Sequence, residues 1–304
     1  MKNKKILIVG ATGFIGYHLA KHCFKKKWRV IGFSKNKPRD IRRLKKIKYI
    51  KGDLFKEKDL RKIKDKIDYV VNLGGYVDHS NKNETYRSHY IGCKNLSNYF
   101  LNKNLKSFIQ MGSGGEYGKI NSPHKETFRC KPKSVYSRSK FLATKHLLRL
   151  NKKYNFPCTI LRLYQTFGDK QAINRLIPIV ITSCIKGKKF PCSEGKQYRD
   201  FVHVDDVVSA IMKCINKKTA NGQIFNLGTG KPIKIKKLII LIRDKIGDGY
   251  PDFGKIKLRN EETLKIFPKV NKIKKLINWK PKMSLLKGLK KLSLHFKKKT
   301  INNL

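Results

Sequence analysis

The chain has 304 residues, of which 72 are Lys or Arg and 20 are Asp or Glu, so its formal net charge is +52. A hydrophobic content of 39% excludes the disordered class, and no apolar run approaches the roughly 18 residues of a membrane-spanning helix. Seven scattered cysteines without a CxxC spacing suit a reducing compartment better than a disulfide framework. We therefore expect a cytoplasmic protein with no membrane partner.

The positive charge has two explanations. A nucleic-acid-binding protein would use such an excess to neutralise phosphates. The lysines, however, are spread over nearly every expected surface helix and loop, with no recognition-helix, zinc-finger or RNP-type pattern. The sequence therefore favours a background of abundant Lys, Asn and Ile over specific nucleic-acid binding. Anionic small molecules should still be attracted, more strongly at low salt.

Residues 4–16, KKILIVGATGFIG, place three glycines directly after a short run of β-forming residues. A strand that enters a glycine-rich turn and then a helix builds a pocket for a dinucleotide pyrophosphate, because free N–H groups and the positive end of the helix dipole face the anion. Gly10 allows the tight turn, Gly13 the approach to the phosphates, and Gly16 the helix–strand packing. A plain glycine-rich turn is the alternative.

Apolar runs and amphipathic segments alternate after this turn, which predicts βαβ units and a doubly wound parallel sheet. We expect strands over 28–33, 48–51, 69–73 and 107–111, and helices over 13–26, 84–102 and 134–151. His18 and His22 lie four apart on the first helix. Without a third ligand this spacing is a weak metal signal, and we expect no metal site.

The end of the second expected strand bears on the cofactor. In this class of sheet an acid there binds the adenosine 2′-hydroxyl, whereas small and basic residues accommodate a 2′-phosphate. The strand ends in Ser34 and Lys35, with no acid until Asp40. Lys35 could belong to the lysine background, so the missing acid is the stronger argument. The sequence favours NADP, with NAD as a possibility.

Ser113 follows the strand expected over 107–111, and ligands of open α/β sheets bind at the carboxyl ends of the strands. Tyr136 and Lys140 lie four apart on one face of the next expected helix. A nearby ammonium lowers the pKa of a tyrosine, which suits a proton donor. Four of the thirteen tyrosines have Lys at this spacing. Only Tyr136 follows a strand-end serine at a spacing that could return the chain to the same cleft.

These residues and the glycine turn make the sequence resemble the extended short-chain dehydrogenase/reductase family, also called the NAD-dependent epimerase/dehydratase family. Its members are nucleotide-sugar epimerases, dehydratases and 4-ketoreductases. Nine elements in order carry the resemblance: GATGFIG, GDL, NLGG, Ser113, YSRSK, LRLYQTFGD, QYRDFVHVDDVVSAI, NLGTGKPIKI and INWKPKMSLLKGLK.

The resemblance implies a Rossmann domain of residues 1–168 and 197–220 and a smaller α/β substrate domain of residues 169–196 and 221–304. A nucleotide-diphosphate sugar would bind in the cleft between them. It also implies a homodimer formed through a four-helix bundle, built from the helices that begin near residues 84 and 134.

The resemblance further implies individual roles. Tyr136 resembles the general acid/base, Lys140 its electrostatic partner and ribose ligand, and Ser113 a hydrogen-bond donor to the reacting oxygen. Cofactor contacts are implied at Gly10, Thr12, Gly13, Phe14, Ile15, Gly16, Ser34, Lys35, Asp53, Leu54, Leu73, Gly74, Gly75, Tyr136 and Lys140. Substrate contacts are implied at Gln165, Asn174, Arg175, Arg199 and Arg259.

Arg199 and Arg259 resemble the family's diphosphate arginines, and a bidentate arginine suits a diphosphate. Two of the arginines also have simpler interpretations. Arg199 could pair with Asp205 or Asp206, and Arg175 could be a solvated cation.

Departures from the family pattern narrow the reaction. The family's 4,6-dehydratases place an Asp-Glu pair directly after the catalytic Ser or Thr, whereas this chain has Gly114 and Gly115, with Glu116 one position too late. Gln165 replaces a common Asn, and His89 and Cys93 also replace commoner residues.

The missing acid after the second strand favours a reductase that uses NADPH on a nucleotide-activated 4-keto-6-deoxysugar. The alternative is an NAD-dependent 4-epimerase. A cofactor-sensing regulator without chemistry, or a nucleic-acid-binding protein, belongs to another class. The retained Ser113, Tyr136 and Lys140 argue against both.

Overall fold

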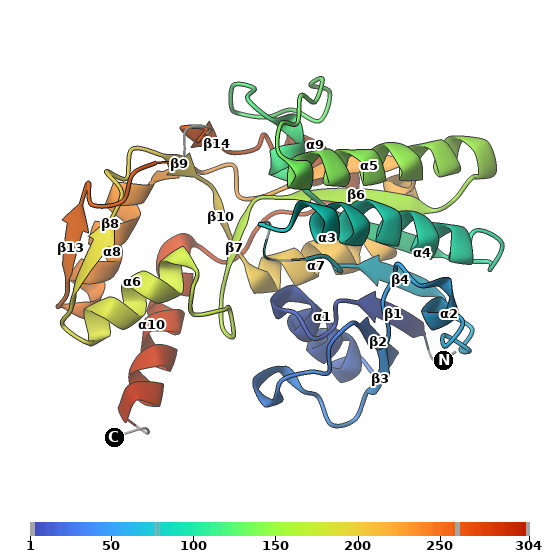
Figure 1. Ribbon diagram of the computed structural model, residues 1–304, viewed down its shortest axis with the longest axis horizontal. Coiled ribbons are helices and arrows are strands. Elements are labelled where there is room, and N and C mark those ends of the chain that lie inside the picture. Colours follow the sequence, from blue (N-terminus) through green and yellow to red (C-terminus); the bar gives the residue numbers. More distant parts are fainter. Residues whose placement is uncertain (1–3, 77, 79, 259–261, 302–304) are drawn as a thin grey trace.

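A seven-stranded parallel sheet forms the centre of the computed structural model, which describes residues 4–76, 78, 80–258 and 262–301, with side chains up to 297 (Figure 1). The strand order is β11-β6-β5-β4-β1-β2-β3. The strands are β1 (Lys5–Val9), β2 (Arg29–Ser34), β3 (Lys48–Lys51), β4 (Tyr69–Asn72), β5 (Ser107–Ser113), β6 (Cys158–Leu163) and β11 (Gln223–Leu227). The order reverses at β1, which pairs with β2 on one side and β4 on the other. This confirms the predicted doubly wound sheet.

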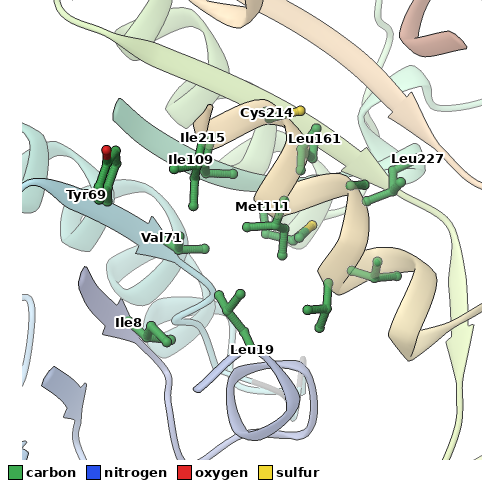
Figure 2. Close-up of a cluster of buried hydrophobic side chains, with 14 of the residues drawn as sticks. Ile8, Leu19, Tyr69, Val71, Ile109, Met111, Leu161, Cys214, Ile215 and Leu227 are labelled. Carbon is green, nitrogen blue, oxygen red and sulfur yellow. The ribbon is translucent and has the colours of Figure 1, made fainter. Parts of the chain in front are cut away.

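Both faces of the sheet are buried, so its strands read as continuous apolar runs. In β1, Ile6 and Ile8 enter one hydrophobic core and Leu7 and Val9 the other, because successive side chains of a strand alternate between faces. The first core also contains residues of α1 (Phe14–Lys25), α7 (Val204–Ile215) and α9 (Asn271–Ile277). Figure 2 shows side chains from adjacent strands facing Leu19 of α1 and Cys214 of α7. The opposite core contains residues of α2 (Glu57–Leu60), α4 (Gly92–Phe100) and α5 (Val135–Tyr154).

A smaller region surrounds a third hydrophobic core formed largely by α6 (Leu176–Ile185), α8 (Ile235–Ile246) and α10 (Leu285–Ile301), on the left of Figure 1. Its sheets are short. They pair β8 (Lys189–Cys192) with β13 (Tyr250–Phe253), β7 (Gln165–Phe167) with β10 (Phe201–His203), and β9 (Tyr198–Arg199) with β12 (Ile233–Lys234) and β14 (Lys265–Ile266). The short 3₁₀ helices of the chain are η1 (Asp40–Arg42), η3 (Gly114–Tyr117) and η4 (Lys218–Ala220).

The structure differs from expectation in three places. The helix expected over 84–102 consists of α3 (Lys82–Tyr86), a π-helical turn η2 (Arg87–Ile91) and α4. β5 continues two residues beyond the expected end, so Ser113 is its last residue. β11 pairs with β6 in the large sheet, although the expected second domain included residues 221–304. Within the described residues, no helix is long and apolar enough to cross a membrane.

Candidate functional site

The glycine turn leaves a space that side chains would fill. Gly10 has φ +77°, and its N–H donates to the carbonyl oxygen of Phe33 at 2.8 Å. A Cβ on Gly16 would lie 2.2 Å from the carbonyl oxygen of Gly10, so only glycine permits this approach of helix and turn. Gly13 is the N-cap of α1 and has no side chain that could accept the first N–H groups of the helix. An anionic ligand could accept these N–H groups instead.

The predicted cofactor residues gather around the carboxyl ends of β1, β2, β3 and β4, which are neighbours in the sheet. Ser34 ends β2, and its Oγ is buried without a hydrogen-bond partner among the described residues. An orphaned hydroxyl beside the glycine turn fits a ribose or phosphate oxygen. The others in this group are Thr12, Phe14 and Ile15 at the start of α1, Asp53 and Leu54 after β3, and Leu73, Gly74 and Gly75 after β4.

Lys35 has acidic neighbours that lie far from it in the sequence. Its Nζ lies 3.1 Å from Oε2 of Glu84 and 3.6 Å from Oδ2 of Asp53. The carboxylates that the end of β2 lacks in sequence are therefore supplied in space by α3 and by the loop after β3. The hydrogen bond that Lys35 donates to Glu84 is the main cause that raises the pKa of Lys35.

Ser113 and Lys140 lie at the same strand end. Ser113 is the N-cap of η3, and its Oγ accepts the N–H of Gly115 at 3.1 Å. α5 begins after Ser134, whose side chain accepts the N–H of Ser137, and this start directs Lys140 towards β5. Lys140 is buried and donates from Nζ to the carbonyl oxygen of Met111 at 2.7 Å. Ser113 and Met111 are two residues apart in β5, so the serine and the ammonium belong to one site.

Tyr136 completes this group, but its pKa differs from the expectation. Burial raises the pKa of Tyr136, and its hydrogen bond with Ser113 partly offsets this rise. Lys140 does not depress it as expected, because its Nζ lies 6.0 Å from the centre of the phenol ring and bonds to Met111. The expectation of a lowered tyrosine pKa is therefore wrong for the protein alone. Burial lowers the pKa of Lys140 to about 8.

Glu116 lies beneath this group with its side chain fully buried. Its Oε1 accepts the N–H of Ser113 at 2.9 Å, and its Oε2 accepts from Thr144 Oγ1 at 2.9 Å and from Arg162 Nε at 3.0 Å. In the sequence, Glu116 stands out only as a dehydratase acid displaced by one position. The pattern Ser-x-x-Glu, which is a capping box, was the signal that it points back at Ser113.

His89 was also noted only as a departure from the family. It belongs to the π-helical turn η2, and its ring packs edge-on against Tyr136, with centroids 5.0 Å apart. Its Nε2 lies 3.1 Å from the carbonyl oxygen of Tyr76. A Cβ on Gly75 would lie 2.0 Å from this imidazole. Gly75 therefore makes room for His89, in addition to any ligand.

The predicted substrate residues are less tightly grouped. Arg199 in β9 is buried and pairs with Glu262 rather than with Asp205 or Asp206, and it donates to the carbonyl oxygen of Leu264 at 3.2 Å. Arg175, the N-cap of α6, is exposed but close enough to lower the pKa of Tyr136. Gln165 begins β7 and Asn174 is exposed, and Arg259 lies outside the described residues.

The family model described as the NAD dependent epimerase/dehydratase family matches residues 6–228. The chain belongs to this family. The match confirms the family predicted from the nine motifs, and it spans the glycine turn, Ser113, Tyr136, Lys140 and Arg199. The chain is therefore a member of an enzyme family whose fold is the NAD-binding Rossmann type.

Proteins that are similar to this chain are named for different activities. CDP-abequose synthase of Salmonella muenchen is 26% identical, over 95% of this chain and 97% of its own. A solved UDP-glucose 4-epimerase of Thermotoga maritima with UDP-glucose has a TM-score of 0.92 at 24% identity, covering 97% and 99% of the two chains. The UDP-glucose 4-epimerase of Thermus thermophilus in complex with NAD has a TM-score of 0.88 at 20% identity, covering 96% and 99%. The two structures confirm the fold.

A cavity of about 610 Å³ lies away from this family's strand-end site, between α1 and α10. Its lining includes His18 and His22, the pair noted in the sequence, together with His203 and His295. No predicted catalytic or cofactor residue lines it. Within the described parts of the chain, no three His, Cys, Asp or Glu side chains are arranged to hold a metal ion.

Proposed function

We propose that this protein is an NADPH-dependent reductase of a nucleotide-activated 4-keto-6-deoxysugar. The observation that carries the proposal is the convergence of Ser113, Tyr136 and Lys140 at the carboxyl end of β5, two strands from the glycine turn. A seryl hydroxyl, a phenol and an ammonium at one site suit proton transfer to an oxygen that becomes an alkoxide.

The chemistry divides between cofactor and protein. A bound reduced nicotinamide supplies a hydride to the carbonyl carbon. Tyr136 gives its phenolic proton to the carbonyl oxygen, whose π electrons move onto that oxygen as the new C–H bond forms. Ser113 donates a hydrogen bond to the same oxygen, and Lys140 stabilises the negative charge. A tyrosine is protonated at neutral pH, and burial raises the pKa of Tyr136 further, so its phenol can act as the proton donor.

The cofactor preference follows from the end of β2. Ser34 offers an Oγ without a hydrogen-bond partner in the described part of the chain, Lys35 offers an ammonium, and β2 itself ends without a carboxylate. These groups would hold a 2′-phosphate. Elimination of water, by contrast, lacks its acid–base pair, because Gly114 and Gly115 occupy those positions.

A second candidate is an NAD-dependent 4-epimerase. The observation that favours it is the pair of carboxylates at Lys35, since Asp53 and Glu84 would repel a 2′-phosphate and could accept from a ribose hydroxyl. An epimerase regenerates its cofactor within each turnover. It would therefore retain NAD through purification.

The substrate would lie between the large sheet and the smaller region. Arg199 would bind its diphosphate, with Arg175, Asn174, Gln165 and Arg259 around the remaining groups. The net charge of +52 supports attraction of such an anion at low salt. The division into a Rossmann domain and a substrate domain, and cytoplasmic residence, belong to the same proposal.

We also propose a homodimer. α4 and α5 cover the same face of the sheet, and Figure 1 shows them lying side by side with α3. Two copies of this surface would form a four-helix bundle. Light scattering at micromolar concentration should give twice the mass of the chain, and a monomer would contradict this arrangement.

The decisive test replaces the proton donor. Tyr136→Phe should lower turnover about 10²- to 10⁴-fold, because the general acid is lost while the ring is kept. Affinity for NADPH, measured by calorimetry, should be within about twofold of wild type. Tyr154→Phe, on the same helix but half exposed, is the matched control and should retain full activity. Undiminished turnover in Tyr136→Phe would remove Tyr136 from its role, and a preference for NADH with retained NAD would favour the epimerase.

A further inference from the structure

A buried carboxylate, that of Glu116, lies beneath the candidate catalytic serine. Glu116 has no exposed surface, and its partner Arg162 is 2% exposed. Gly112 faces the same carboxylate, since a Cβ on Gly112 would lie 2.5 Å from Glu116 Oε1. The chain thus reserves space at β5 for a buried charge. Replacing such a pair with apolar residues is often neutral or stabilising, so stability alone does not explain it.

The contacts of Glu116 lead directly to the candidate catalytic groups. Its Oε1 accepts the N–H of Ser113, the residue whose Oγ faces Tyr136. Ser113 is also the N-cap of η3 and is held at two points. Glu116 accepts its backbone N–H, and its side-chain Oγ accepts the N–H of Gly115. This reciprocal capping box fixes the rotation of the serine at the end of its strand.

The charge of Glu116 also reaches the helix above. Thr144, one turn beyond Lys140 on α5, donates to Glu116. Burial lowers the pKa of Lys140 to about 8, and Glu116 is the largest influence that counteracts this effect. Cys93 of α4 is the other group that raises the pKa of Lys140. Tyr136 is affected by the same carboxylate, which raises its pKa, and by Arg175, which lowers it.

We propose that Glu116 is a positioning residue that orients Ser113 through its N–H and joins it to the helix of Lys140 through Thr144, with Arg162 fixing the carboxylate. Glu116 touches neither cofactor nor substrate. The inference rests on the proposed function, because it assumes that Ser113 and Lys140 act in the reaction. It adds a requirement which that function does not contain, namely a buried negative charge between strand and helix.

Two variants and a control test the inference. Glu116→Gln removes the charge but leaves Arg162 buried and unpaired, so it can fail to fold. The double variant Glu116→Gln, Arg162→Gln removes both charges and keeps polar groups at both positions. Glu126→Gln is the matched control, since Glu126 also accepts a backbone N–H, from Asn226 at 2.9 Å, but does not act on Lys140.

The first readout is kcat/KM as a function of pH. In the double variant it should fall about 10- to 100-fold, because a misplaced hydrogen-bond donor loses alignment with the reacting oxygen. The alkaline limb should also move to lower pH, because losing the carboxylate disfavours the ammonium of Lys140. Glu126→Gln should leave the limb in place. A uniform loss with the limb unmoved would show a merely structural role and would overturn the inference.

The second readout does not depend on turnover. The amide resonance of Ser113 in a ¹⁵N-labelled sample should lie downfield in wild type and in Glu126→Gln, and move upfield in the double variant, because an amide oxygen is a weaker acceptor than a carboxylate. An unchanged resonance would overturn the positioning role. If Tyr136→Phe keeps full turnover, the proposed function fails, and this resonance still decides whether Glu116 orients Ser113.

Discussion

The two regions of the molecule each contain an arginine–glutamate pair near the candidate site, and the pairs differ in burial. In the large sheet, Arg162 and Glu116 are 2% and 0% exposed. In the smaller region, Arg199 and Glu262 are 9% and 28% exposed. The first carboxylate is completed by Ser113 and Thr144, whereas the second lies on the loop before β14. One pair is therefore fixed and the other can exchange partners.

Desolvation explains the difference. A buried charge that loses its partner remains without water and is strongly destabilising, whereas a partly exposed carboxylate can be rehydrated at small cost. The groups around Glu116 are accordingly held in one geometry, whereas Glu262 keeps access to water while it pairs with Arg199.

Breaking the buried pair should have the largest effect. Arg162→Met leaves Glu116 uncompensated and should lower the free energy of unfolding by about 3–5 kcal/mol, measured in urea. Arg243→Met, which breaks the exposed pair of Arg243 with Asp244, should cost less than about 1 kcal/mol. Equal losses in the two variants would show that burial does not distinguish the pairs.

Breaking the half-exposed pair should instead change binding. Glu262→Gln removes the carboxylate that occupies Arg199, so the affinity for a nucleotide-diphosphate sugar should rise several-fold. Stability should change by less than about 1 kcal/mol. Glu194→Gln, at an exposed carboxylate paired with Lys196, is the control and should leave the Kd unaltered. A weakened affinity in Glu262→Gln would mean that Glu262 orients Arg199 for its ligand rather than competing with it.

His203, at the boundary between the two regions, should make a small contribution to stability that depends on pH. Burial lowers the pKa of His203, which lines the cavity between α1 and α10 with Asp205 and Lys291 nearby. A histidine whose folded pKa lies below its unfolded value of about 6.5 contributes stability above that pH, and this is lost as the pH falls. His203→Asn keeps an acceptor for the N–H of Asp205, which His203 Nδ1 accepts at 3.2 Å. Its unfolding free energy should drop less between pH 7.5 and pH 5.5 than that of wild type, and equal drops would exclude His203 as the cause.

The large sheet was predictable because its signals are local. Its apolar strands alternate with amphipathic helices, and the glycine turn needs only residues 10–16. β11 was missed as a sheet member because the chain passes through elements of the smaller region between β6 and β11, which breaks the regular alternation of strand and helix. The short paired strands of the smaller region have two to four residues each, too few for a periodic signal.

The candidate site divides in the same way. Ser113, Tyr136 and Lys140 were predicted from strand ends and helical spacing together with the resemblance to the family. The paired state of Arg199 was not, because Glu262 is 63 residues away and nothing in the sequence connects them. The acids around Lys35 were missed for the same reason: Asp53 and Glu84 approach it only once the sheet and α3 are in place. The sequence located the candidate residues, but only the fold shows which charged groups pair with Lys35 and Arg199.

The π-helical turn η2 has a consequence for alignments of this chain. A π turn takes one more residue per turn than the α-helix around it, so α3 and α4 are offset by one position. A homologue with an unbroken α-helix here would match with a one-residue gap between positions 87 and 91. In a gapless alignment, the column containing His89 would pair it with a residue that does not face the tyrosine.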